Sequence, residues 1–424
     1  MEQEIVRTRP RLKDVPMMRC LLLLLVCACP AVAGDDWPSW RGPLGNGVAD
    51  AKQKPPTLWN ESENVLWKAE LPGRGHGSAT VVGDRVYLAA ADAATETQSL
   101  FAFHRETGKK VWQADLHKGG FEKKGNAKGS LASSSPACDG ERIFINFQNA
   151  NGIHTSAVGL DGAIIWQKKV VDYVLHQGFG SSPMLHRSLV IVAADNKGGG
   201  AIVGLDRVSG SLVWSHARPK LPNYVSPVIL TAAGKEQLIL TGCDLVTSLD
   251  PMTGKVNWET KGATTECVTS TVTDGKHIFT TGGYPKNHIA AMAADGSGKV
   301  VWENLTRVYV PSLIVRNDHI YGVIDDGFAV CWRCDTGKEV WRERLGGAFT
   351  ASPVLVGDTI YATNESGVTF LFEASPKGYA FVAKNKLGDE TFASPTICGG
   401  RVYLRVAKKA NGQRQETLYC LGAR

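Results

Sequence analysis

The sequence lacks the short motifs that mark common hydrolases and nucleotide-binding enzymes. Its 424 residues contain no Gly-x-Ser-x-Gly, no His-Glu-x-x-His and no Gly-x-x-x-x-Gly-Lys-Ser/Thr pattern, which removes the usual serine nucleophile, zinc-binding histidine pair and phosphate-binding loop. Two carboxylate pairs occur, Asp325–Asp326 and Asp389–Glu390. Because neighbours on a strand point to opposite faces, we expect both pairs to be solvated. We therefore expect no catalytic residue, although the sequence leaves open whether the protein is an enzyme.

Positive charge is in only slight excess, and the cysteines do not cluster with histidine. A formal net charge of +6 is too small a surplus to predict a nucleic-acid partner, and the one basic loop, residues 122–128, is typical of a solvated hairpin insertion. Cys331 and Cys334 have the spacing of a redox or haem-attachment motif, but Asp335 stands where haem attachment requires histidine. No second Cys/His pair has zinc spacing, so we expect no metal site and thiols that pack as small apolar groups.

No apolar run is long enough to cross a bilayer as a helix. The longest has 14 residues and ends in Ala-x-Ala at Ala33. These features are typical of a secretory signal peptide, so we assign residues 1–33 to a signal, with a start at Met17 or Met18 as an open alternative. A lipoprotein site at Cys29 is a rival interpretation that the neighbouring residues suit poorly. We expect an exported protein, periplasmic or extracellular, with no transmembrane segment after cleavage and no lipid anchor.

What the chain does contain is a unit repeated eight times. Each unit opens with a serine: Ser78, Ser135, Ser182, Ser226, Ser270, Ser312, Ser352 and Ser394. Most units then carry an acidic residue, Thr-Gly or a variant, and a tryptophan; Trp112, Trp166, Trp214, Trp258, Trp302 and Trp341 are spaced by 54, 48, 44, 44 and 39 residues. This period suits a four-stranded propeller blade and is too long for a leucine-rich or ankyrin repeat. The sequence predicts an all-β, eight-bladed propeller of four-stranded antiparallel blades, with seven blades as the alternative.

Each part of the unit has an expected structural role. The serines suit innermost strands, where blades crowd the axis and small side chains act as spacers. The tryptophans should cover the seams between blades, and the acidic-Thr-Gly segment should form a turn with glycine in the left-handed conformation. The last unit lacks an outer strand, whereas residues 64–71 form an orphan strand that carries Trp67. The two chain ends should therefore complete one blade and close the ring.

A segment rich in proline and glycine precedes the propeller, which we assign to residues 64–424. Residues 34–63 include Trp37 and Trp40 within Trp-Pro-Ser-Trp-Arg-Gly-Pro. Because this composition disfavours a regular strand or helix, we interpret the segment as an N-terminal strap. We expect its tryptophans to pin it to the outside of the propeller.

The acidic, Thr-Gly, tryptophan signature is clearest at residues 249–258 and 335–341. With it, the chain resembles the pyrroloquinoline-quinone-repeat (PQQ-like) β-propellers, a superfamily that includes quinoprotein alcohol dehydrogenases and the outer-membrane assembly lipoprotein BamB. A fold of this kind does not by itself define an activity. The BamB resemblance implies an exported, non-catalytic binding or scaffold protein with a protein or cell-envelope partner. The alternatives are a PQQ-dependent oxidoreductase and a glycan-binding or glycan-cleaving propeller.

A quinoprotein would need groups that the sequence supplies poorly. A tricarboxylate quinone requires cationic side chains, a calcium-type cage of oxygen ligands and a flat indole beneath the ring. Of the eleven tryptophans, seven belong to closing strands, Trp37, Trp40 and Trp59 precede the blades, and Trp332 lies in a third strand. The adjacent cysteine pair of many alcohol-oxidising relatives is absent as well. We therefore expect no cofactor, and PQQ with calcium only under the oxidoreductase alternative.

If a ligand binds, the fold places it at the mouth of the central channel, where residues that precede the innermost strands converge. The candidates are Arg74, His76, His176, Gln177, Tyr224 and Glu266, with Tyr309 and Phe349 at equivalent places. The two histidines, each close to glycines, are the most suggestive of these residues. The alternative is that they cap loops and plug the channel without binding anything.

Overall fold

The structure is a computed structural model that describes Met1 and residues 35–122 and 125–423. The expected signal peptide, residues 1–33, lies outside these ranges except for Met1. All described residues from 35 onward belong to one compact unit, and their regular structure consists of strands. Within the described ranges, no helix has the length and apolarity needed to cross a membrane.

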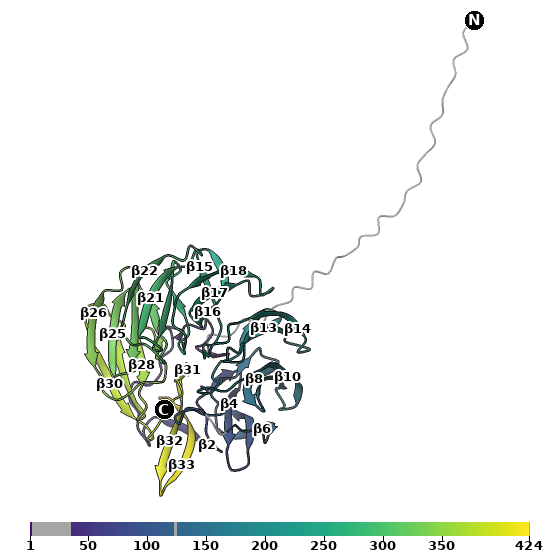
Figure 1. The fold of residues 1–424 in the computed structure, drawn as a ribbon. Coiled ribbons are helices and arrows are strands. Elements are labelled where there is room, and N and C mark those ends of the chain that lie inside the picture. Colours follow the sequence, from purple (N-terminus) through teal and green to yellow (C-terminus); the bar gives the residue numbers. More distant parts are fainter. Residues whose placement is uncertain (2–34, 123–124, 424) are drawn as a thin grey trace. The chain divides into compact units, whose positions relative to one another are not determined.

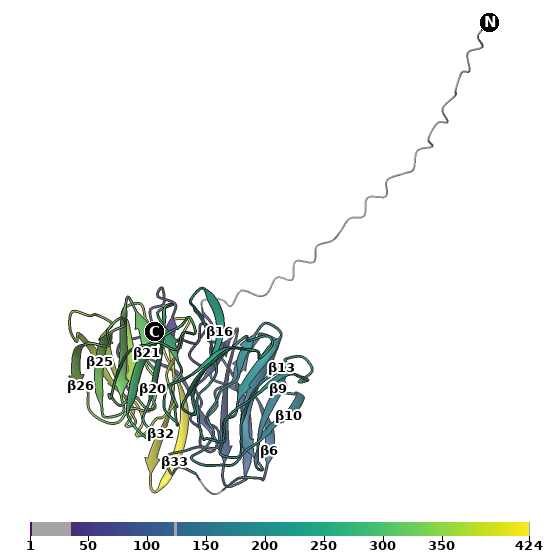
Figure 2. The ribbon, with the colours of Figure 1, turned by 45° about the horizontal axis from the view of Figure 1, so that its top comes forward.

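Eight sheets, each with four antiparallel strands, follow one another around a ring, so the predicted eight-bladed propeller is confirmed (Figures 1 and 2). Each blade runs from an innermost to an outermost strand. Blade one contains β3 (Thr80–Val82), β4 (Arg85–Asp92), β5 (Thr97–His104) and β6 (Lys110–Lys118); blade two contains β7 (Ala137–Cys138), β8 (Arg142–Asn149), β9 (Gly152–Gly159) and β10 (Ile164–Asp172). Blade three contains β11 (Met184–His186), β12 (Leu189–Ala193), β13 (Ala201–Asp206) and β14 (Leu212–Ala217); blade four contains β15 (Val228–Ala232), β16 (Lys235–Gly242), β17 (Leu245–Leu249) and β18 (Val256–Lys261).

The second half of the ring repeats the pattern. Blade five contains β19 (Val272–Thr273), β20 (His277–Gly282), β21 (His288–Ala293) and β22 (Val300–Asn304); blade six contains β23 (Ile314–Arg316), β24 (His319–Ile324), β25 (Phe328–Arg333) and β26 (Glu339–Arg344). Blade seven, whose sequence is degenerate, still has four strands, β27 (Val354–Val356), β28 (Thr359–Thr363), β29 (Val368–Glu373) and β30 (Phe381–Lys386). The alternative of seven blades is therefore wrong.

Blade eight is built from both ends of the chain, as predicted. It contains β31 (Thr396–Cys398), β32 (Arg401–Ala410), β33 (Gln413–Leu421) and, as its outermost strand, β2 (Val65–Leu71). Strand β2 pairs antiparallel with β33, with Trp67 opposite Cys420 and Ala69 opposite Leu418. The long β32–β33 hairpin (yellow) projects beyond its neighbours in Figure 1.

The core is divided into clusters that lie between neighbouring blades. One joins Leu100 and Ile145 from blades one and two, and another joins Ile191 and Leu238 from blades three and four. All seven cysteines between residues 138 and 420 are buried and unpaired, so the interpretation of their thiols as packing groups is confirmed.

The repeated tryptophans cover these seams by packing onto a turn of the next blade. A Cβ added to Gly254 would lie 2.4 Å from the Trp214 ring, and one added to Gly337 would lie 2.4 Å from the Trp302 ring. Both glycines have left-handed φ angles, 67° and 65°. The Trp302 indole N–H also donates to the Cys334 carbonyl at 2.7 Å. Tryptophan and glycine of successive units therefore form one joint, which accounts for their joint recurrence in the sequence.

The opening serines link the innermost strands in addition to filling space. At 2.8–2.9 Å, the backbone N–H of one serine donates to the hydroxyl of the next in six pairs: Ser78 to Ser135, Ser135 to Ser182, Ser182 to Ser226, Ser270 to Ser312, Ser312 to Ser352, and Ser352 to Ser394. The interpretation of these serines as spacers was incomplete, because their hydroxyls satisfy buried backbone donors of the preceding blade.

The N-terminal strap enters the channel, so the expectation that its tryptophans lie on the outside of the propeller is wrong. Trp37 is 2% exposed and forms a bridge with Val81 of the innermost strand β3. The Trp40 indole N–H donates to the Ser270 hydroxyl of blade five at 2.8 Å. The physical reason is that the innermost strands leave backbone groups unpaired along their inner edge, and the strap can pair with them. An indole also suits the channel, because its ring packs against apolar groups while its N–H donates a hydrogen bond.

The rest of the strap continues across the innermost strands of later blades. Arg41 donates to the Leu313 carbonyl in blade six at 2.6 Å. Strand β1 (Val48–Ala49) then pairs in parallel with β27 of blade seven. The strap therefore spans from blade one to blade seven and forms the floor of the space above it.

Candidate functional site

A cavity of about 1070 Å³ lies at the end of the channel where the innermost strands begin. The Trp40 side chain lines it together with the opening serines Ser182, Ser226, Ser352 and Ser394. The walls are loops that precede innermost strands or connect the second and third strands of a blade. The strap therefore turns the central channel into a pocket that is open at one mouth.

Five of the six candidate residues from the sequence line this cavity: His76, His176, Gln177, Tyr224 and Glu266. Tyr309 and Phe349 line it as well. Arg74 is not a lining residue. Its guanidinium donates to the Lys128 carbonyl at 3.0 Å and lies 5.6 Å from the centre of the Phe392 ring, beside the seam between blades eight and one.

Glu266 is the most buried charged residue of the cavity wall, at 4% exposure. Its Oε1 lies 3.3 Å from His176 Nε2, and its Oε2 accepts a hydrogen bond from the Tyr309 hydroxyl at 3.1 Å. Burial, followed by the nearby Glu266 carboxylate, raises the pKa of Tyr309 and of Tyr224 above the usual phenol value. Both phenols therefore remain protonated and can donate hydrogen bonds at neutral pH.

His76 presents a neutral imidazole to the cavity. Burial lowers its pKa well below 6.5, and the charges of Arg74, Arg405 and Arg414 act in the same direction. Its ring lies 4.4 Å from the Phe392 ring, and its Nε2 is shielded from solvent without a hydrogen-bond partner in the described part of the chain. A buried polar atom left in this state is costly unless a ligand or water satisfies it.

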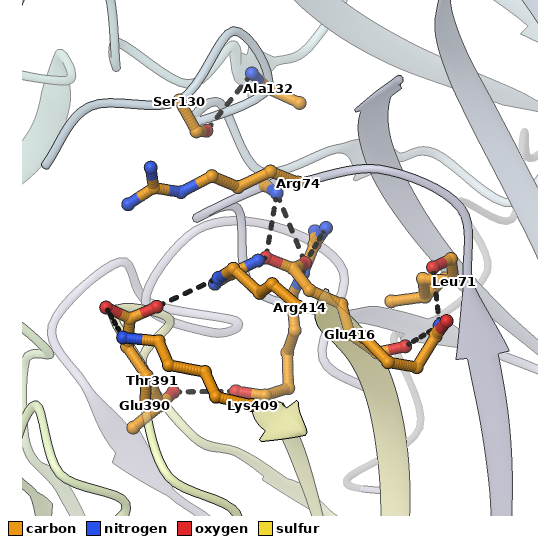
Figure 3. Close-up of polar contacts among 12 residues, drawn as sticks. Leu71, Arg74, Ser130, Ala132, Glu390, Thr391, Lys409, Arg414 and Glu416 are labelled. Carbon is orange, nitrogen blue, oxygen red and sulfur yellow. Dashed lines mark hydrogen bonds and ion pairs between the residues drawn. The ribbon is translucent and has the colours of Figure 1, made fainter. Parts of the chain in front are cut away.

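An ion network lies beside Arg74, at the seam that closes the ring (Figure 3). The Arg405 and Glu416 side chains are both buried and form a direct pair. Arg414 bridges Glu416 and Glu390, and it lies 2.8 Å from the Glu390 carboxylate. The charges of this cluster act on Arg74, whose own side-chain contacts are with the Lys128 carbonyl and the Phe392 ring.

Sequence reasoning missed the acidic residues of the opposite wall. Asp325, Asp326 and Glu365 line the cavity from the hairpin loops of blades six and seven. Asp326 is exposed, but Asp325 accepts the Tyr309 backbone N–H at 2.8 Å, and burial raises its pKa. The expectation that both members of this pair are solvated is therefore wrong for Asp325. Their position in the blade could have indicated these residues, because the loops between second and third strands lie at the end of the ring where the innermost strands begin.

In the Asp389–Glu390 pair, Asp389 is exposed as expected, whereas the Glu390 side chain is 19% exposed and thus less solvated than expected. The Asp389 carboxylate accepts the Lys409 backbone N–H at 2.9 Å. Glu390 binds Arg414 and the Lys409 ammonium, the latter at 3.2 Å. This pair stabilises the β32–β33 hairpin, and neither residue lines the cavity.

A PQQ cofactor finds only one of its three requirements in this cavity. The Trp40 indole supplies a flat ring at the floor, a place that the sequence did not indicate. The two permanently cationic lining residues are already engaged, Lys128 with Glu365 at 2.8 Å and Arg307 with Asp325 at 3.8 Å. No group of three or more His, Cys, Asp or Glu side chains in the described ranges is arranged to hold a metal ion. Among the described residues, the lining therefore offers a calcium-bound tricarboxylate few cationic partners and no cluster of three carboxylate, His or Cys ligands.

Fold and cavity together define a PQQ-like β-propeller with a channel closed at one end. The family model described as "Outer membrane protein assembly factor BamB" matches residues 56–172, 96–343 and 285–375. These matches span most of the propeller, and the chain belongs to this family.

Curated relatives include both a BamB and a dehydrogenase. The outer membrane protein assembly factor BamB of Burkholderia pseudomallei (strain K96243) is 25% identical over 376 residues, 84% of this chain and 89% of that protein. A polyvinylalcohol dehydrogenase of Pseudomonas sp is 26% identical over 256 residues, which cover 55% of this chain but 37% of the dehydrogenase. The match to BamB therefore extends over nearly the whole relative, whereas the match to the dehydrogenase covers a part of it.

Solved structures share the fold at low identity. The crystal structure of BamB from Moraxella catarrhalis matches with a TM-score of 0.57 and 17% identity, over 84% of this chain and 96% of that chain. Quinohemoprotein alcohol dehydrogenase from Comamonas testosteroni matches with a TM-score of 0.68 and 13% identity, over 94% of this chain and 82% of that chain. At such identities the likeness establishes the propeller fold and leaves the activity open.

Proposed function

We propose that this protein is an exported, non-catalytic binding or scaffold propeller that acts in the assembly of outer-membrane proteins. The observation that carries the proposal is the BamB family match together with 25% identity over 89% of a BamB relative. A propeller suits such a role because its rigid ring presents many loops and outer strands to a protein partner. The partner in this proposal is a protein or another component of the cell envelope.

Export is part of the proposal and rests on the sequence. The signal peptide assigned to residues 1–33 lies outside the described ranges apart from Met1. BamB relatives give no support for the absence of a lipid anchor, so the proposal extends to export and not to the mode of attachment.

An oxidoreductase with a quinone cofactor is the second candidate. The polyvinylalcohol dehydrogenase relative and the Trp40 indole at the cavity floor favour it. The small number of cationic lining residues weighs against it, since Lys128 and Arg307 are the two permanently cationic ones and each lies beside a carboxylate of the same wall. We therefore propose that the protein uses no cofactor.

The assembly role is tested by deletion of the gene in its host. Outer-membrane fractions are compared for folded, heat-modifiable β-barrel proteins in the parent strain, the deletion strain and a strain complemented with the intact gene. We expect the deletion to lower barrel-protein levels and complementation to restore them. A gene without codons 1–33 is the matched control, because the same propeller retained inside the cell should not complement. Unchanged barrel-protein levels in the deletion strain would contradict the proposal.

The second candidate has its own readout. Purified protein is incubated with PQQ and Ca²⁺, passed through a desalting column, and examined for retained quinone absorbance and alcohol-dependent dye reduction. We expect neither signal. Retained quinone with dye reduction would replace the scaffold proposal by the oxidoreductase.

A further inference from the structure

The cavity is acidic within a chain that carries net positive charge. Glu266, Asp325, Asp326 and Glu365 line it, on loops of three successive blades, five to seven. Its two permanently cationic lining residues are Lys128 and Arg307, whereas the whole chain has a formal net charge of +6. Low-dielectric walls concentrate such a local field and favour a ligand of opposite charge.

The mouth already holds one alkylammonium group, which belongs to the chain itself. Lys128 lies on the loop between blades one and two, yet its ammonium reaches Glu365 of blade seven at 2.8 Å. The Glu365 carboxylate also accepts a hydrogen bond from the Thr350 hydroxyl. The Lys128 side chain is 64% exposed, so this pair is weak and open to exchange with a competing amine.

Aromatic rings line the space between these carboxylates. Trp40 forms the floor, and Tyr224, Tyr284, Tyr309 and Phe349 contribute to the walls. The Arg307 guanidinium lies 5.3 Å from the centre of the Tyr309 ring, which illustrates how this wall receives a cation. Aromatic faces attract cations and also pack against methylene groups. A linear ligand with separated cations and an apolar chain between them matches this alternation.

His76 also lines the cavity, and because its imidazole is neutral it does not repel a cation. Its Nε2 is shielded from solvent, so recognition of a cation falls to the carboxylates and the aromatic walls.

We propose that the channel cavity binds a linear polyamine, with its ammonium groups on Glu266 and on the Asp325–Asp326 pair and its methylene chain against the aromatic walls. A volume of about 1070 Å³ is ample for a small organic ligand. This site is separate from the proposed role in outer-membrane assembly, which depends on a protein partner.

Isothermal titration calorimetry with spermidine tests this site. We expect saturable binding to the wild-type protein that weakens as salt rises. Glu266→Gln keeps the side-chain shape and removes the charge, and it should weaken binding about tenfold. Asp326→Asn should also weaken binding, and this exposed residue can be replaced without risk to folding. Asp335→Asn is the matched control, because it removes an exposed carboxylate on the outer side of blade six, away from the cavity.

The outcomes distinguish specific binding in the cavity from non-specific electrostatic attraction. Weaker binding by the two cavity variants, with the Asp335→Asn protein unchanged, supports the site. Absence of binding to the wild-type protein at millimolar spermidine overturns it. Equal weakening by Asp326→Asn and Asp335→Asn also overturns it, since non-specific screening would then account for the heat. A thermal melt of each variant identifies any loss of folding.

Discussion

At the scale of single residues, the sequence predicted where a residue lies in the repeat but not which residue it contacts. The sequence placed His76, His176 and Glu266 at the channel mouth because they precede innermost strands, and they do line one cavity. Asp325 was interpreted as solvated and Glu365 was not considered, because both lie in hairpin loops, where acidic residues are common and usually solvated. The Ser-to-Ser hydrogen bonds escaped as well, since their partners lie 40–57 residues apart. A repeat shows that a small side chain recurs, but it does not show which backbone N–H donates a hydrogen bond to that side chain.

The serine hydrogen bonds give a prediction with an internal control. Ser135→Ala removes the hydroxyl that accepts the Ser78 backbone N–H at 2.8 Å, and it leaves a buried donor unsatisfied. The free energy of unfolding should fall by about 1–3 kcal/mol. Ser78→Ala removes a buried hydroxyl that has no hydrogen-bond partner within the described residues, so it should change stability little. Chemical denaturation of both variants measures the difference, and equal losses would show that the hydroxyls act only as spacers.

At the scale of elements, the sequence predicted almost all of the structure of a blade. The acidic turn forms as expected: Asp250 Oδ1 accepts the backbone N–H groups of Met252 and Thr253 at 2.9 Å each. What the pattern did not reveal is that a tryptophan packs on the glycine of the following unit, as Trp214 does on Gly254 and Trp302 does on Gly337. Periodicity gives the spacing of two residues along the chain but not which copies meet in space, and that pairing depends on how the blades are arranged around the ring.

The joint between tryptophan and glycine predicts unequal costs for two alanine substitutions. Gly254 and Gly234 both have left-handed φ angles, 67° and 73°, so alanine at either should cost about 1–2 kcal/mol. Only at Gly254 would the new Cβ meet an indole, 2.4 Å from Trp214, whereas nothing lies within 4 Å at Gly234. Gly254→Ala should therefore cost about 1–3 kcal/mol more. Denaturant unfolding curves of the two variants provide the comparison, and similar midpoints would contradict it.

The β32–β33 hairpin makes a second prediction for this scale. Glu416 is 1% exposed and pairs with the equally buried Arg405. Glu416→Gln would leave Arg405 as a buried charge without its counter-ion, so we expect a loss of about 3 kcal/mol. Glu339→Gln, which breaks the exposed Arg342 pair at 2.7 Å, should scarcely change stability. Thermal melts of both variants test this contrast; an intact melt for Glu416→Gln would show that the seam does not depend on the charge pair.

At the scale of the whole molecule, ring closure was predictable and the course of the strap was not. A unit without an outer strand and an orphan strand with Trp67 complete each other, and β2 does pair with β33. For Trp37 and Trp40, the sequence contains no comparable missing element that would indicate where they pack. Tryptophan suits an outer groove as well as a channel floor, and the hydrogen bond from Trp40 to Ser270 joins residues 230 positions apart. The strap determines whether the channel is open or forms a pocket. The course of the strap is therefore the feature most relevant to a ligand, and it was the one that the sequence predicted least well.

The stability of the whole molecule should fall as the pH drops from 7 toward 4.5, because several histidines are buried as neutral rings. Burial, with a smaller contribution from His154, lowers the pKa of His117 to about 4, and burial also lowers the pKa of His154. Below about pH 6.5 the unfolded chain takes up protons at these positions, whereas the folded chain does not do so at His117 until about pH 4. Folding is therefore opposed progressively through this window.

A variant isolates this effect from the titration of other groups. His117→Phe keeps an aromatic ring beside Phe147, whose ring lies 6.0 Å from the imidazole, and it removes one titrating site. The fall in melting temperature between pH 7.5 and pH 4.5 should be smaller in the variant by roughly 2 °C or more. Carboxylates such as Asp325 titrate in both proteins, so their contributions cancel in the comparison. Because the folded pKa is depressed, the difference must grow on the acid side; a difference that is the same at both pH values would mean that His117 affects packing and not proton uptake.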